Sequence, residues 1–181
     1  MQTKLSFANS GLREYCTKYL KRMRPHVSSV VVVYDSAVPE YLLGQATAGV
    51  IDSGCNMKLI KAARGEKNKT VESAIQLATK LLKAKVDRNS LVLAVGGGVT
   101  SDVTGFAASM TLRGVRWACL PTTLLSMVDA SIGGKTVVNA LGAKNMIGAF
   151  HFPEFVHIDF RWLKSLPERE FRSGLGELQK T

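Results

Sequence analysis

The chain of 181 residues is basic, with 24 Lys and Arg against 14 Asp and Glu and a formal net charge of +10. An apolar content of 46% is typical of a folded protein with a core and excludes a polar, disordered chain. No apolar run approaches the ~20 residues that a membrane span needs, so we expect no membrane partner.

The predicted elements alternate between helix and strand along the chain. Apolar residues at helical spacing predict helices over 12–23, 71–86 and 99–112, with Thr70 as the N-cap of the second. Short apolar or β-branched runs predict strands over 29–34, 56–62, 91–95, 117–120 and 155–159. Pro121 is expected to open a short helix, and a last helix is predicted over 168–180. This order predicts an α/β fold, a Rossmann-like parallel sheet flanked by helices.

Three consecutive glycines, Gly96, Gly97 and Gly98, stand between the strand at 91–95 and the next helix. Glycine lets the backbone turn sharply and approach a ligand closely. The free N–H groups at the start of the following helix can bind a diphosphate. A plain strand-to-helix turn is the alternative, and it rarely needs three glycines.

Polar side chains follow other predicted strands at the same rim. Asp35 ends the strand at 29–34, and Thr122 and Thr123 follow the strand at 117–120. Because ligands gather beyond the carboxyl ends of parallel strands, these positions predict one ligand site. Asp35 suits a ribose hydroxyl or, equally, a simple turn. Asp102 suits a ribose or a carboxamide, or a favourable charge near a helix start.

Two glycine-rich segments after Asp129 present lysines, at Lys135 and at Lys144 beside Asn145. The first segment, 132–139, is predicted to be a flexible loop or a hairpin. These side chains can reach a phosphate or a carboxylate, or they are exposed loop lysines.

The basic side chains do not favour nucleic acid, because the aromatic residues, 7% of the chain, are not interleaved with them. Solvated helix faces, or a field that attracts an anionic small molecule, account for the charge. Cys16, Cys55 and Cys119 lack metal or redox spacing and are typical of thiols in a reducing compartment, so we expect a cytoplasmic protein.

The motifs together resemble the 3-dehydroquinate synthase family. They read GGGVTSDVTGF, RGVRWACLPTTLLSMVDASIGGKT, KNMIGAF and LPEREFRSGLGE, in that order. Related sugar-phosphate cyclases and metal-dependent alcohol dehydrogenases share the triple glycine followed by an aspartate. The later motifs favour dehydroquinate synthases over the dehydrogenases, and KNMIGAF favours them over the other cyclases.

The resemblance implies a site for NAD and a sugar phosphate. The implied NAD contacts are Asp35, Glu66, Lys69, Gly97, Gly98, Val99, Asp102, Thr122, Thr123, Leu125, Lys144, Trp162, Ser165 and Leu166. The implied substrate contacts are Asp129, Lys135, Asn145 and Lys180, with Arg113 supplied by the partner in a homodimer. By residue type alone Glu177 is an exposed helical glutamate, but the resemblance gives it the position of a carboxylate ligand to zinc or cobalt.

The implied reaction is a carbon–oxygen lyase reaction, which cyclises 3-deoxy-arabino-heptulosonate 7-phosphate to 3-dehydroquinate with loss of phosphate. Family members continue into a helical domain with two histidine ligands, whereas this sequence stops one residue after Lys180. We therefore expect an NAD-binding domain over 1–166, the start of an otherwise missing helical domain over 167–181, and no activity of this chain alone. A non-catalytic NAD-binding or regulatory remnant and another sugar-phosphate cyclase are the alternatives.

Overall fold

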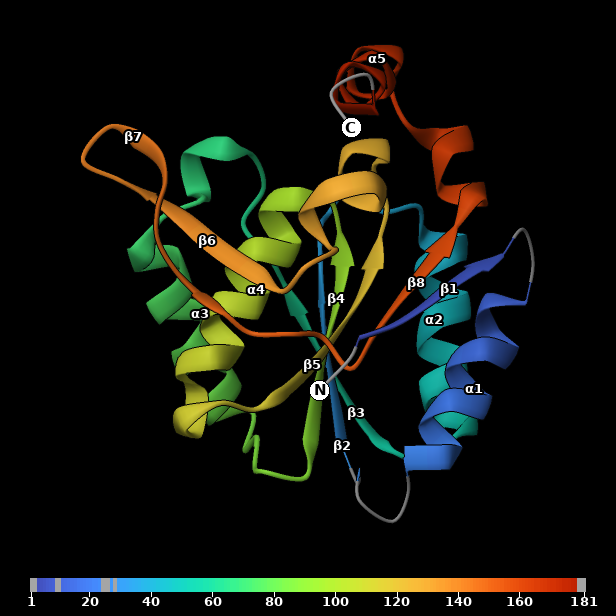
Figure 1. The fold of residues 1–181 in the computed structure, drawn as a ribbon. Helices are drawn as coiled ribbons and strands as arrows, with labels where there is room; N and C mark the ends of the chain where they lie inside the picture. Colours follow the sequence, from blue (N-terminus) through green and yellow to red (C-terminus); the bar gives the residue numbers. More distant parts are fainter. Residues whose placement is uncertain (1–2, 9–10, 24–26, 28, 179–181) are drawn as a thin grey trace.

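A computed structural model describes residues 3–8, 11–23, 27 and 29–178, with the backbone alone at Ala130, Glu177 and Leu178. Six parallel strands form the central sheet in the order β1-β8-β5-β4-β2-β3 (Figure 1). Their bounds are β1 Lys4–Ala8, β2 Ser29–Tyr34, β3 Asn56–Lys61, β4 Ser90–Gly96, β5 Arg116–Pro121 and β8 Phe155–Asp159. The predicted Rossmann-like α/β fold is confirmed.

Helices cover both faces of this sheet, with α1 and α2 on one side and α3 and α4 on the other (Figure 1). The helices are α1 Leu12–Met23, α2 Glu40–Asp52, α3 Val71–Lys83, α4 Gly98–Met110 and α5 Glu168–Leu178. Shorter turns are η1 Glu66–Asn68, η2 Thr111–Arg113, η3 Ser126–Ala130 and η4 Phe160–Ser165. A two-stranded antiparallel sheet, β6 Lys135–Ala140 with β7 Ala143–Phe150, forms a hairpin that projects beside α4 (Figure 1).

Burial on both faces explains the unbroken apolar strands. Every residue of β4 is buried, as are Val30 to Val33 in β2, so neither strand shows the alternation of a half-exposed sheet. The helix α3 has one buried face, and its predicted cap is confirmed because the Thr70 hydroxyl accepts the Ser73 N–H at 3.2 Å.

The helix α4 is buried on two sides, against the sheet and against the hairpin. A Cβ on Gly105 would stand 2.4 Å from Cγ2 of Thr136 in β6 and 3.0 Å from the Trp117 ring in β5. This glycine therefore lets the hairpin pack close to α4, which places the hairpin residues near the start of that helix.

Three of the helices and strands, β1, α2 and β7, were absent from the sequence prediction. The strand β1 is a largely exposed edge strand, and α2 contains Gly44 and Gly49, which weaken its helical signal by ~1 kcal/mol each. Gly49 has a packing role, since its Cβ would lie 2.6 Å from the Arg13 carbonyl oxygen in α1.

The prediction for Pro121 is wrong. Pro121 is the last residue of β5, opposite Gly96, and the following helical turn begins only after Thr123. The ladder hydrogen bond at this point comes from the Thr122 N–H to the Gly96 carbonyl at 2.9 Å, so the proline needs no N–H of its own. Helices α3 and α4 also end before the predicted bounds, at Lys83 and Met110.

The helix α5 begins at Glu168, and whether a second domain starts there stays a prediction. Within the described part of the chain, no helix combines the length and the apolar character required to cross a membrane.

Candidate functional site

A cleft of about 860 Å³ lies at the carboxyl ends of the strands. It sits beyond β2, β4 and β5, where the chain order in the sheet changes direction, which is the usual ligand position in open parallel sheets. The lining includes all fourteen residues that the resemblance implies for NAD: Asp35, Glu66, Lys69, Gly97, Gly98, Val99, Asp102, Thr122, Thr123, Leu125, Lys144, Trp162, Ser165 and Leu166. Three of the implied substrate contacts, Asp129, Lys135 and Asn145, line it as well.

The glycine turn after β4 brings the start of α4 close to the turn after β5, and all of these segments line the cleft. Gly97 is the N-cap of α4, and the first residues of that helix line the cleft. A Cβ on Gly97 would stand 2.9 Å from Cγ2 of Thr123, so glycine lets the turn after β4 approach the turn after β5. The free N–H groups of the first helical turn are thus available to an anion in the cleft.

Asp35 both forms a turn and lines the cleft, so the structure is consistent with each of the two roles that the sequence left open, a turn residue and a ribose contact. Its Oδ1 accepts the Ala37 N–H at 2.8 Å, which is a turn-forming contact, and it also lines the cleft. Nε of Arg64 lies 3.8 Å from Oδ1 of Asp35. No role was expected for Arg64 from the sequence, although the glycine after it, Gly65 with φ of +88°, marks a special turn.

Asp102 is paired inside the protein. Its side chain is 6% exposed, and its Oδ2 lies 2.7 Å from Nζ of Lys69, whose side chain is 10% exposed. Burial raises the pKa of Asp102 to about 6, while the Lys69 hydrogen bond and charge and the Val137 N–H act to lower it. Asp129 raises it slightly further by like charge. The role near a helix start is not confirmed, because Asp102 lies beyond the first turn of α4.

The hairpin β6–β7 carries both lysine segments, with Lys135 at its open end and Lys144 and Asn145 next to its turn. Lys135 begins β6, Lys144 and Asn145 begin β7, and all three are exposed in the cleft. The structure therefore decides between the loop and the hairpin in favour of a hairpin.

Asn139 is a structural residue that sequence reasoning missed. It donates from Nδ2 to Oε1 of Glu66 at 2.8 Å and from its backbone N–H to the Lys69 carbonyl at 2.8 Å. Its Oδ1 accepts the Asn145 N–H at 3.0 Å. These bonds tie the hairpin to the segment 66–69. No local signal marked Asn139, because two of its three partners, Glu66 and Lys69, come from a distant part of the chain.

Three predicted residues are not placed in the cleft. Arg113 lies in η2 at the far end of α4 and is not among the lining residues. Lys180 lies outside the described residues, and so does the side chain of Glu177. Across the side chains that the structure describes, no group of three or more His, Cys, Asp or Glu could hold a metal ion.

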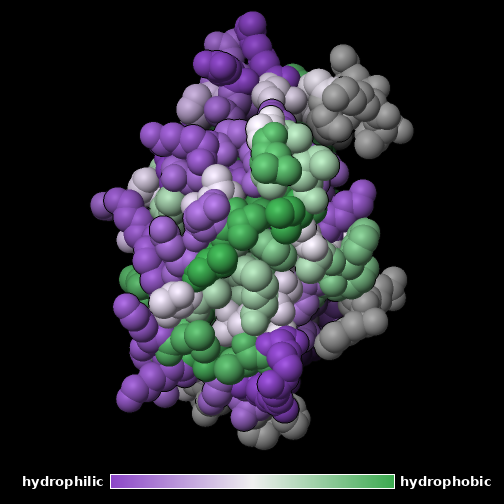
Figure 2. All heavy atoms as spheres, turned by 90° about the vertical axis from the view of Figure 1, so that its left-hand side faces the viewer, coloured by the Kyte–Doolittle hydropathy of each residue, from purple (hydrophilic) through white to green (hydrophobic). Residues whose placement is uncertain are grey.

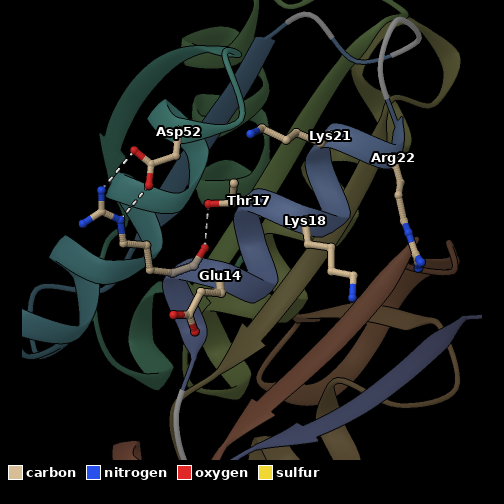
Figure 3. A pocket seen from close by; sticks show the side chains of 7 residues that line it. Glu14, Thr17, Lys18, Lys21, Arg22 and Asp52 are labelled. Atoms are coloured by element: carbon tan, nitrogen blue, oxygen red, sulfur yellow. Dashed lines mark hydrogen bonds and ion pairs between the residues drawn. The ribbon is translucent and has the colours of Figure 1, made fainter.

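A second hollow, of about 790 Å³, lies on the outer face of α1 (Figure 3). Lys18, Lys21 and Arg22 extend from the helix there, and Arg13 pairs with Asp52 of α2 at 2.6 Å. The hollow is open and none of the predicted site residues lines it, so the rim cleft is the candidate site.

The parallel sheet and the glycine-lined cleft at its switch point define the Rossmann-like class of α/β domains. Residues 59–173 match the family described as 3-dehydroquinate synthase N-terminal. The 3-dehydroquinate synthase of Pelobacter propionicus is 44% identical over 151 residues, which are 83% of this chain and 42% of that protein. The chain therefore belongs to the 3-dehydroquinate synthase family, and it spans less than half the length of the curated relatives it matches.

Two solved structures share the fold over almost the whole chain. The first is 2-deoxy-scyllo-inosose synthase complexed with carbaglucose-6-phosphate, NAD⁺ and Co²⁺, with a TM-score of 0.85 and 28% identity over 97% of this chain and 48% of that one. The second is 2-epi-5-epi-valiolone synthase from Streptomyces hygroscopicus subsp. jinggangensis, with NAD⁺ and Zn²⁺ bound, a TM-score of 0.84 and 29% identity over 98% of this chain and 48% of that one.

Proposed function

We propose that this chain forms the NAD-binding half of a 3-dehydroquinate synthase. The complete enzyme would cyclise 3-deoxy-arabino-heptulosonate 7-phosphate to 3-dehydroquinate with loss of phosphate, in the cytoplasm. The observation that carries this proposal is that one cleft gathers all fourteen implied NAD contacts. Identity of 41–48% to 3-dehydroquinate synthases, against 28–29% to two other cyclases, disfavours another sugar-phosphate cyclase.

The residues of the cleft fit a dinucleotide. Its volume of about 860 Å³ lies within the range of cofactor sites. The turn at Gly97 offers backbone N–H groups to a diphosphate, and Asp35 and Glu66 offer carboxylates to ribose hydroxyls. Nε1 of Trp162 is a buried donor without a hydrogen-bond partner in the described structure, and Trp162 lines the cleft. When bound, NAD supplies a reversible hydride acceptor.

The opposite side of the cleft fits an anionic substrate. Lys135 and the Asn145 amide project from the hairpin as donors for a phosphate, and Asp129 offers a carboxylate to ring hydroxyls. Lys180 is proposed to bind ring hydroxyls together with Asp129.

We also propose that two copies associate. Ile147 and Phe150 on the hairpin, and Met110 and Leu112 at the end of α4, are exposed. Figure 2 shows apolar surface across this side of the molecule. Arg113 follows Leu112 and does not line its own cleft, which supports its role in the cleft of a second copy. Light scattering should find a dimer, and Phe150→Lys should weaken it; a wild-type monomer at high concentration would contradict this assembly.

Zinc or cobalt is proposed for the complete enzyme, with Glu177 as one ligand. The described side chains offer no metal cluster of their own, so we derive no step through a metal. The other ligands are expected from a helical domain, as in the implied family pattern.

Calorimetric titration with NAD⁺ tests the cofactor site. Gly97→Ala should weaken binding at least tenfold, because its methyl group displaces Thr123, which also lines the cleft. Gly44→Ala makes the same change in α2, where a Cβ meets nothing within 4 Å, and should leave binding unchanged. If the wild-type chain fails to bind NAD⁺, the proposed function is wrong.

Phosphate release tests the reaction. The chain alone should release no phosphate from 3-deoxy-arabino-heptulosonate 7-phosphate. Adding the C-terminal half of a family member should restore turnover. NAD⁺ binding without turnover in that mixture would favour a non-catalytic, NAD-binding role.

A further inference from the structure

Lys69 connects the two sides of the cleft. Its Nζ donates to Oδ2 of Asp102 in α4 at 2.7 Å and to Oδ1 of Asn145 in the hairpin at 2.7 Å. The Lys69 residue is only 8% exposed, so the ammonium group is held between these two partners. Asp102 is itself buried and directs the lysine, because a buried carboxylate needs a charged partner.

The contact with Lys69 determines which way the Asn145 amide faces. An ammonium group carries donors and no acceptor, so only the amide oxygen of Asn145 can face it. The NH₂ group, which is coplanar with this oxygen, must then lie on the opposite side of the Cβ–Cγ bond, away from Lys69. Since Asn145 is exposed and lines the cleft, its two N–H donors are presented to a ligand.

The backbone of Asn145 is held as well. Its φ of +58° is unusual for a residue other than glycine, and its N–H is bonded to Oδ1 of Asn139 at 3.0 Å. The backbone N–H and the side-chain oxygen are therefore both held within the protein, which leaves the NH₂ group to face a ligand. An arrangement of this kind reduces the entropy lost when an anion binds.

We propose that Lys69 is a positioning residue for the anion-binding side of the cleft. It acts through Asn145, by holding the amide so that its NH₂ group meets the phosphate of the substrate. This inference rests on the proposed function, in which Asn145 binds that phosphate. It adds that Lys69, implied only as an NAD contact, also determines how well an anion is bound.

The first test follows the Asn145 side-chain amide by NMR in ¹⁵N-labelled chain loaded with NAD⁺ and titrated with inorganic phosphate. The amide pair is assigned by its loss in Asn145→Ala. Phosphate should shift this pair in the wild type, and the shift should disappear in Lys69→Met, where the amide is free to rotate. An Asn145 amide that does not respond to phosphate in the wild type overturns the proposal.

The second test is a double-mutant cycle on phosphate affinity. Lys69→Met should weaken binding about tenfold in the wild-type background, the loss expected from one hydrogen bond to a charged group, and less than twofold in the Asn145→Ala background. Equal losses in both backgrounds would show that Lys69 acts on the anion by its charge alone, and would overturn the proposal. Lys67→Met is the matched control, because Lys67 is exposed and outside the cleft lining.

Asn145→Asp tests the same geometry without removing Lys69. The new carboxylate still accepts from Lys69 but replaces the NH₂ donors by an oxygen, so phosphate binding should fall at least as far as in Asn145→Ala. Unchanged phosphate binding in Asn145→Asp contradicts the inference. Failure of the wild type to bind NAD⁺ is a separate result, which overturns the proposed function. The double-mutant cycle on phosphate affinity, measured without NAD⁺, then still tests whether Lys69 acts through Asn145.

Discussion

The buried carboxylate of Asp102 makes a pH-dependent contribution to stability that Asp102→Asn should remove. Its pKa rises from an ordinary value of 3.8 to about 6 in the folded chain, mainly through burial. The folded protein therefore holds this proton at a higher pH than the unfolded chain does. The resulting stabilisation is complete below pH 4 and is lost as the pH rises through 6. A shift of about two pKa units corresponds to ~3 kcal/mol in the free energy of unfolding.

Urea unfolding, followed by tryptophan fluorescence between pH 4 and pH 7, measures this contribution. The stability of the wild type minus that of Asp102→Asn should fall by ~2.5 kcal/mol over that range, since part of the change has already occurred at pH 4. Asp52→Asn is the control, because the Arg13 hydrogen bond lowers the pKa of Asp52 below its ordinary 3.8, so the stability difference between this variant and the wild type should stay nearly constant between pH 4 and pH 7. Parallel pH profiles for the wild type and Asp102→Asn would refute the reasoning.

Four further substitutions test the packing and the turns by urea unfolding. Gly49→Ala should destabilise the chain by ~1–3 kcal/mol, because its Cβ meets the Arg13 carbonyl oxygen at 2.6 Å, whereas Gly44→Ala in the same helix should stabilise it by up to ~1 kcal/mol. Equal effects of the two would contradict the packing of α1 on α2. Leu141→Asn should stabilise the hairpin by ~1 kcal/mol, since Leu141 is fully exposed and has a φ of +52° at the turn; a loss of stability would indicate that the leucine is needed there. Thr70→Ala should cost ~1 kcal/mol by removing the cap of α3, and no change would mean that the cap bond is replaced by water.

The central strands and the rim positions could be predicted because their signals are local. An apolar run that ends in glycines, as at Gly96 to Gly98, predicts both a buried strand and a sharp turn within a few residues. The carboxyl ends of parallel strands share one edge of the sheet, so Asp35 and Thr122 could be assigned to one site before any contact was known. The edge strand β1 and the helix α2 could not be predicted, since exposure in one and glycines in the other hide the pattern.

The amino-acid sequence by itself determined the fold class, the family motifs and the set of residues at the rim. Only the tertiary structure decided that Lys69, Asp102 and Asn145 form one network. From the sequence each of these residues was expected to contact a ligand, whereas in the fold they contact each other. The reason is physical: a buried charge requires a partner, and which partner is within reach depends on how α4 and the hairpin pack, not on spacing along the chain.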